Sequence, residues 1–139
     1  MITRMPSGFI KTIAKRFNMK KVVMIEDSKV LGTALSGALK VEGVDVHWAK
    51  NGVEGVALAK QVKPDLILLD LMLPKLSGFE VCKLLKTDNT TWRIPVVIMS
   101  TLTDEESRTR AKESGADYFI AKPYDLAQTL AEIKKHLKM

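Results

Sequence analysis

The chain has 139 residues, 46% of them apolar and 27% charged, which fits a single domain with a sizeable core and leaves no room for a second. Its net charge of +6 comes from residues 1–21, which hold six bases and no acid, so that 22 minus 6 leaves 16 bases against all 16 acids. This neutral remainder argues against direct nucleic-acid binding by the domain. A single cysteine, Cys82, and the lack of a signal peptide or membrane-spanning run indicate a cytoplasmic protein in which Cys82 serves in packing.

Residues 1–20 form a predicted extension ahead of the domain, which covers residues 21–139. With Ser7 as N-cap, the extension has the pattern of a short basic amphipathic helix. Its apolar stripe and its basic face consist of Phe9, Ile10, Ile13 and Phe17, and of Lys11, Lys15 and Arg16. Such a helix packs on its own domain or frays, or else it docks on a membrane surface or a partner protein. The sequence leaves these alternatives open.

From Lys21 onward, short apolar runs alternate with amphipathic segments. The runs predict five strands, at residues 22–25, 44–49, in a third run that ends at Asp70, and at 96–99 and 118–121. The segments between and after them predict five helices, three of which begin at capping pairs. These pairs are Asn51 with Glu54, Thr103 with Glu106, and Asp125 with Gln128. Strands and helices in alternation predict an open, doubly wound α/β sheet with helices on both faces.

The third strand is the most informative stretch of the chain. From Pro64 to Pro74 it reads PDLILLDLMLP, an apolar run that delivers one carboxylate, Asp70, before Pro74 stops it. Asp70 therefore lies at the carboxyl end of a central strand, the edge at which open parallel sheets bind ligands. The alternative is an Asp that only caps a turn.

Other predicted strands end in chemically useful groups at the same edge: Glu26 and Asp27, Ser100, and Lys122. Three carboxylates within a few ångströms repel one another by roughly 4 kcal/mol per pair at an effective dielectric constant of about 20, so they need a cation. Oxygen ligands without His or Cys favour Mg²⁺. A carboxylate beside Mg²⁺, faced by a hydroxyl and an ammonium, accepts a phosphoryl group as an aspartyl phosphate. The alternative is that these acids are solvated separately at loop starts.

Several motifs together resemble the receiver domain of two-component response regulators. They are EDS at 26–28, LDLMLP at 69–74, Gly78, IPVVIMS at 94–100, GAD at 115–117 and KP at 122–123, and they fall within residues 21–139 in the family's order and spacing. The resemblance implies the flavodoxin-like strand order 2-1-3-4-5. It also implies a stand-alone phosphorylation switch that receives phosphate from a histidine kinase or histidine phosphotransfer protein. The output would be phosphorylation-dependent binding to a further protein.

The resemblance implies a role for each site residue. Asp70 is the implied phosphoacceptor, and Asp27, with Glu26, Asp70 and the backbone carbonyl of Met72, is the implied ligand set for Mg²⁺, which Mn²⁺ can replace. Lys122 is the implied phosphate-binding lysine. The implied switch pair is Ser100 and Phe119, and the residues expected to tune hydrolysis of the phosphoryl group are Met72, Thr101 and Leu102.

Two other functions stay open at the level of sequence. One is a Mg²⁺-dependent phosphohydrolase with Asp70 as nucleophile, disfavoured because Met72 stands where such enzymes commonly place a second acid. The other is a degenerate receiver that acts only as a docking module, which the complete set of site residues argues against. We therefore expect a receiver that catalyses only its own phosphoryl transfer and slow dephosphorylation, not an enzyme.

Overall fold

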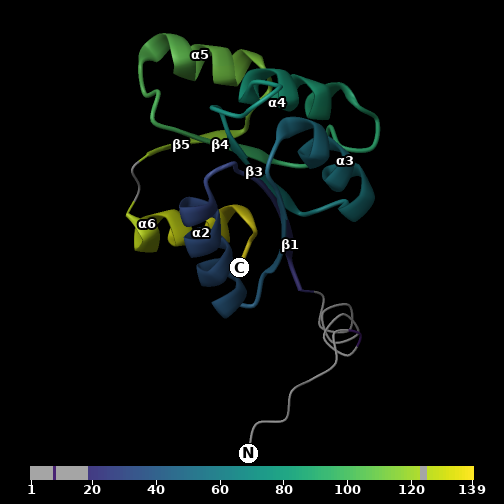
Figure 1. Ribbon diagram of the computed structural model, residues 1–139, viewed down its shortest axis with the longest axis vertical. Coiled ribbons are helices and arrows are strands. Elements are labelled where there is room, and N and C mark those ends of the chain that lie inside the picture. Colours follow the sequence, from purple (N-terminus) through teal and green to yellow (C-terminus); the bar gives the residue numbers. More distant parts are fainter. Residues whose placement is uncertain (1–7, 9–18, 123–124) are drawn as a thin grey trace, which may run out of the picture.

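The computed structural model describes residue 8, residues 19–122 and residues 125–139. Five parallel strands form one sheet in the order β2-β1-β3-β4-β5, with helices on both faces (Figure 1). The strands are β1 (Lys21–Ile25), β2 (Asp45–Ala49), β3 (Leu66–Asp70), β4 (Val96–Ser100) and β5 (Tyr118–Ala121), and the helices are α2 (Lys29–Val41), α3 (Gly52–Val62), α4 (Gly78–Thr87), α5 (Glu105–Glu113) and α6 (Leu126–His136). The predicted fold and strand order are confirmed. The predicted helix within residues 1–20 falls almost wholly outside the described residues.

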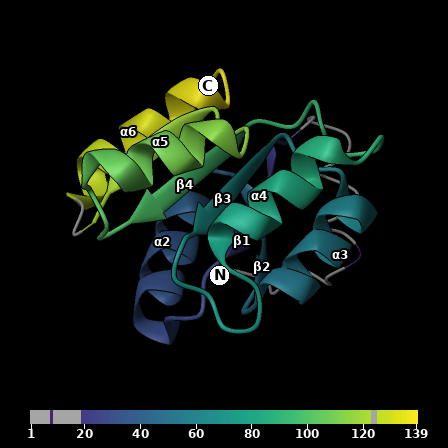
Figure 2. The ribbon, with the colours of Figure 1, turned by 90° about the horizontal axis from the view of Figure 1, so that it is seen from above.

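Two helix layers enclose the sheet. α2 and α6 contact each other on one face, and α4 lies between α3 and α5 on the other (Figures 1 and 2). In β1, Val23 and Ile25 join the core beneath α3, α4 and α5, whereas Val22 and Met24 join the core beneath α2 and α6. Alternate residues of a strand point to opposite faces, so a strand covered on both sides needs a continuous apolar run. In the described part of the chain, no helix has the length and apolar character needed to cross a membrane.

The predicted caps of α3 and α6 are confirmed. The Asn51 side chain accepts the N–H of Glu54 at 2.9 Å, and the Asp125 side chain accepts the N–H of Gln128 at 3.3 Å. Cys82 lies buried in the core beneath α3, α4 and α5, as predicted.

The predicted cap of α5 is wrong by one residue. Asp104, not Thr103, is the N-cap, and its carboxylate accepts the backbone N–H of Ser107 at 3.0 Å and the Ser107 hydroxyl at 2.8 Å. A carboxylate that accepts both donors of one residue is a stronger N-terminal partner than a threonine hydroxyl. The helix therefore begins one residue later than the capping pair predicts.

The parallel strands bring their carboxyl ends to one edge of the sheet. Asp70 ends β3 and Ser100 ends β4, while Glu26 directly follows β1 and Lys122 directly follows β5. The backbone N–H of Lys122 donates to the carbonyl oxygen of Ser100 at 2.7 Å, so β4 holds the backbone of Lys122 in place. We call Glu26, Asp27, Asp70, Ser100 and Lys122 the carboxyl-edge site.

Candidate functional site

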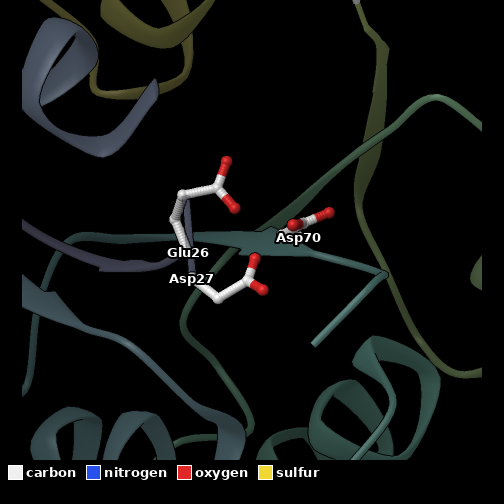
Figure 3. Close-up of side chains that lie close together, drawn as sticks. All are labelled: Glu26, Asp27 and Asp70. Atoms are coloured by element: carbon white, nitrogen blue, oxygen red, sulfur yellow. The ribbon is translucent and has the colours of Figure 1, made fainter. Parts of the chain in front are cut away.

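Three carboxylates converge at the carboxyl-edge site. Glu26 and Asp70 are buried, whereas Asp27 is exposed. One oxygen from each of the three residues lies within 4.8 Å of the others, and Figure 3 shows the side chains projecting beyond the ends of β1 and β3. The predicted cluster is present, and it lies where two buried strands leave the sheet.

Lys122 supplies positive charge to this cluster. Its Nζ lies 2.7 Å from Glu26 Oε1 and 3.5 Å from Asp70 Oδ1, and all three side chains are less than a tenth exposed. Sequence reasoning places Lys122 at this edge but misses its direct pairing with Glu26, because the two residues are 96 positions apart. A single ammonium does not balance three carboxylates.

The excess of carboxylates affects the pKa of Asp70. Burial and the neighbouring Glu26 carboxyl raise the pKa of Asp70 from its ordinary 3.8 to about 7, against the opposing effects of Lys122 and of the Met72 backbone N–H. That N–H donates to Asp70 Oδ1 at 3.2 Å. Near neutral pH, Asp70 is therefore poised between its acidic and ionised forms.

A hard cation fits this site. Glu26 Oε2 is buried without a hydrogen-bond partner among the described residues, and a buried carboxylate oxygen is costly unless something satisfies it. It belongs to an all-oxygen donor set together with Asp27 and Asp70. This donor set suits Mg²⁺ or Mn²⁺.

Ser100 and Phe119 lie on neighbouring strands, β4 and β5. Ser100 is fully buried, and its hydroxyl oxygen accepts the N–H of Leu102 at 2.9 Å. Phe119 is half-buried, and the guanidinium carbon of Arg108, from α5, lies 4.7 Å from the centre of its ring. The Arg108 contact is absent from the sequence predictions, because nothing in the pattern of α5 relates it to β5.

The loop that follows Asp70 requires glycine at residue 78. The Gly78 N–H donates to the carbonyl oxygen of Leu71 at 2.9 Å, and an added Cβ would lie 2.6 Å from both the Asp70 carbonyl oxygen and Leu71 Cα. Met72 and Leu102 are 61% and 39% exposed, and Thr101 is also exposed. The backbone of the loop after Asp70 is thus closely packed at Gly78, while the apolar side chains of Met72 and Leu102 are exposed to solvent.

The comparisons agree with this geometry. A family model described as the response regulator receiver domain matches residues 22–134, a span that contains the whole carboxyl-edge site. The DNA-binding dual master transcriptional regulator RpaA of Synechocystis sp. is 39% identical over 120 residues, which are 86% of this chain and 50% of that protein. The chain thus spans half the length of this curated relative.

Two solved structures show the same fold. The chemotaxis protein CheY4 of Vibrio cholerae is similar with a TM-score of 0.80 and 27% identity, over 84% of this chain and 98% of the other. The BeF3-activated N-terminal receiver domain of RstA from Klebsiella pneumoniae is similar with a TM-score of 0.79 and 31% identity, over 86% and 99% of the two chains.

Proposed function

The chain belongs to the response regulator receiver domain family, and from that premise we propose that it accepts a phosphoryl group on Asp70 and signals by phosphorylation-dependent protein binding. The donor is a histidine kinase or a histidine phosphotransfer protein, and the switch acts in the cytoplasm. The observation that carries this proposal is the buried Asp70, held beside two further acids and the Lys122 ammonium. The domain acts on its own phosphoryl group and is not an enzyme for other substrates.

The metal of this proposal is Mg²⁺, with Mn²⁺ as a substitute. Glu26, Asp27, Asp70 and the backbone carbonyl of Met72 would hold it. The assignment is supported by Glu26 Oε2, which has no hydrogen-bond partner in the part of the chain that the structure describes. When bound, the cation supplies positive charge that keeps Asp70 ionised and offsets charge on the transferred phosphoryl group.

Transfer requires Asp70 in its ionised form. One of its oxygens forms the new O–P bond while the P–N bond of the donor phosphohistidine breaks, and the released imidazole takes up a proton. Lys122 lies close enough to Asp70 to neutralise a phosphoryl oxygen there, and the Ser100 hydroxyl donates to another. Asp70 and Ser100 are the last residues of β3 and β4, so the sheet holds the backbone that carries both groups.

The switch of this proposal uses Ser100 and Phe119. The phosphoryl group draws the Ser100 hydroxyl away from the Leu102 N–H that it accepts in this structure, and Phe119 moves into the vacated space. This movement reshapes the face formed by α5 and α6. Phosphate supplies the difference in contact energy between the two states. Ser100→Ala should take up phosphate yet lose most of the phosphate dependence of partner binding. Full phosphate dependence in that variant would contradict the coupling.

Phosphate uptake tests the function itself. With acetyl phosphate or a phosphohistidine donor, the protein should become labelled on Asp70 in the presence of Mg²⁺ and stay unlabelled with a chelator or as Asp70→Asn. Labelling of Asp70→Asn at the parent rate would contradict the proposal. Steady release of phosphate from organic phosphates would indicate a phosphohydrolase, and absence of labelling with any donor would indicate a docking module.

The extension at residues 1–20 is proposed to be a separate docking element of the domain at 21–139. Its concentrated charge and apolar stripe support this assignment. Deletion of residues 1–18 should leave phosphate uptake unchanged and reduce binding to vesicles of anionic lipid or to an acidic partner. Loss of folding on deletion would instead support packing of the extension on its own domain.

A further inference from the structure

We propose that Trp48 is a positioning residue for the metal-binding carboxylates, an inference that rests on the Mg²⁺ site of the proposed function. The indole N–H of Trp48, in β2, donates a 2.8 Å hydrogen bond to the backbone carbonyl oxygen of Glu26. The backbone N–H of Glu26 donates in turn to the carbonyl oxygen of Ala49 at 3.0 Å. β2 therefore holds both backbone polar groups of Glu26.

The Trp48 bond acts on Asp27 as well as on Glu26. The carbonyl of Glu26 belongs to the planar peptide unit that leads into Asp27, so fixing its oxygen fixes the direction in which the chain leaves β1. Asp27 is exposed, unlike Glu26 and Asp70. The position of its carboxylate therefore depends on the backbone that carries it more than on packing.

Gly32 holds the indole ring in position. A Cβ at this buried position of α2 would overlap Cζ2 of the Trp48 ring, so a larger residue would displace the ring. The Gly32 N–H also donates to the carbonyl oxygen of Ser28 at 2.9 Å. Ser28 is the N-cap of α2, and its hydroxyl oxygen accepts the N–H of Leu31. The segment from Glu26 to Ser28 is thus supported by β2 on one side and by the first turn of α2 on the other.

The consequence is a preorganised pair of carboxylates. The loss of a group that orients a metal ligand commonly lowers the affinity for the metal. Without the Trp48 N–H, the Glu26 carbonyl would also lose the energy of one hydrogen bond. Trp48→Phe keeps an aromatic ring against Gly32 but removes the N–H. Gly32→Ala keeps the N–H but displaces the ring that carries it. The two variants therefore disrupt the same hydrogen bond in different ways: the first removes its donor, and the second displaces the ring that carries the donor.

Calorimetric titration of the metal-free protein with Mg²⁺ alone tests the proposal. Trp48→Phe and Gly32→Ala should each weaken Mg²⁺ binding by roughly five-fold to ten-fold. In Trp92→Phe, which leaves Trp48 as the only tryptophan of the chain, Mg²⁺ should shift the indole fluorescence with the affinity found by calorimetry. Trp92→Phe itself should bind Mg²⁺ like the parent.

A control variant distinguishes an effect on the position of the metal-binding carboxylates from a general loss of protein stability. Val46→Ala lies in the same strand and trims a side chain packed on the same core as Trp48, so it should lower the melting temperature while Mg²⁺ affinity stays within about two-fold of the parent. Equal affinity in Trp48→Phe and the parent, or an equal loss in Val46→Ala, would overturn the inference while leaving the proposed function intact. A parent protein that binds no Mg²⁺ would overturn the metal site and this inference together.

Discussion

Two lysines of this protein form ion pairs at opposite edges of the sheet. At the amino edge, Lys86 Nζ lies 2.8 Å from both Asp117 Oδ2 and the Ile94 carbonyl oxygen, and the same Asp117 oxygen accepts the N–H of Val96 at 2.8 Å. At the carboxyl edge, Lys122 faces Glu26 and Asp70, yet one oxygen of Glu26 has no partner among the described residues.

The difference separates a network of balanced charges from one that is suited to binding a cation. At the amino edge the Lys86 ammonium pairs with one carboxylate and also donates to the carbonyl oxygens of Ile94 and Trp92, so its charge and its hydrogen bonds are both balanced. At the carboxyl edge negative charge is in excess and buried, which costs stability unless a cation joins it. The second arrangement is suited to binding because it is incomplete.

Replacing the two lysines in turn gives the largest expected contrast. Lys122→Met should slow phosphate uptake by roughly 100-fold or more, because it removes a cation from the position where phosphoryl charge develops. Lys86→Met should take up phosphate at the parent rate. The initial rate with acetyl phosphate and Mg²⁺ measures both. Similar slowing in the two variants would show that the edges do not differ in function.

The stability of Lys86→Met tests the structural role of the amino edge. Lys86→Met leaves the Ile94 carbonyl and the Asp117 carboxylate without their shared donor, so the free energy of unfolding should fall by about 1–3 kcal/mol. Lys83→Met, on the exposed side of α4, is the control and should change it by less than about 0.5 kcal/mol. Urea denaturation measures both values. An equal change in the free energy of unfolding in the two variants would show that Lys86 has no special structural role.

Metal removal should make the carboxyl edge sensitive to pH. Without metal, the folded protein keeps a proton on Asp70 up to a pKa of about 7, whereas the unfolded chain releases it near 3.8. Stability from this group therefore falls as pH rises between those values. In chelator, the melting temperature of the parent should fall relative to that of Asp70→Asn from about pH 4 to about pH 7, and Mg²⁺ should close the gap.

The comparison with Asp70→Asn removes a contribution of opposite sign. Burial lowers the pKa of His136 below 6.5, so the folded protein resists protonation there and gains stability as pH rises through that range. Because His136 is present in both proteins, its effect cancels in the difference. Melting temperatures of the two proteins that stay parallel at every pH would contradict the raised pKa of Asp70.

The smallest expected effect concerns the lifetime of the phosphoryl group. Exposed Met72 and Leu102 offer no hydrogen bond to orient a hydrolytic water, and Thr101 adds a branched side chain beside them. Met72→Asn combined with Leu102→Gln should speed the decay of labelled protein several-fold after donor removal. An equal or slower decay would show that these side chains do not set the lifetime.

The sequence predicts the fold well because the central strands β1, β3 and β4 are buried on both faces. Such strands need unbroken apolar runs, and residues 66–70 and 96–100 show this directly. The cap of α5 is mispredicted because Thr103 and Asp104 both suit the position, and the two hydrogen bonds that Asp104 accepts from Ser107 favour Asp104.

For the site, sequence reasoning places the acids and Lys122 at one edge, where the structure also has them, while the roles assigned to them stay predictions. The Glu26–Lys122 pair, the Arg108–Phe119 contact and the Trp48 hydrogen bond could not be predicted. Each contact joins residues that come together only when separate elements pack. A local sequence pattern does not indicate which of these side chains will be in contact.

The pairing of Glu26 with Lys122 across 96 positions has a consequence for protein synthesis. While the chain is being made, Asp70 and both of its acidic neighbours leave the ribosome well before Lys122 does. A nascent chain therefore carries Asp70 without the lysine that completes its surroundings, because β5 must join the sheet to bring Lys122 there. If the proposed function holds, only a chain that has been translated past Lys122 and has folded can accept phosphate, so products that end before Lys122 would not signal.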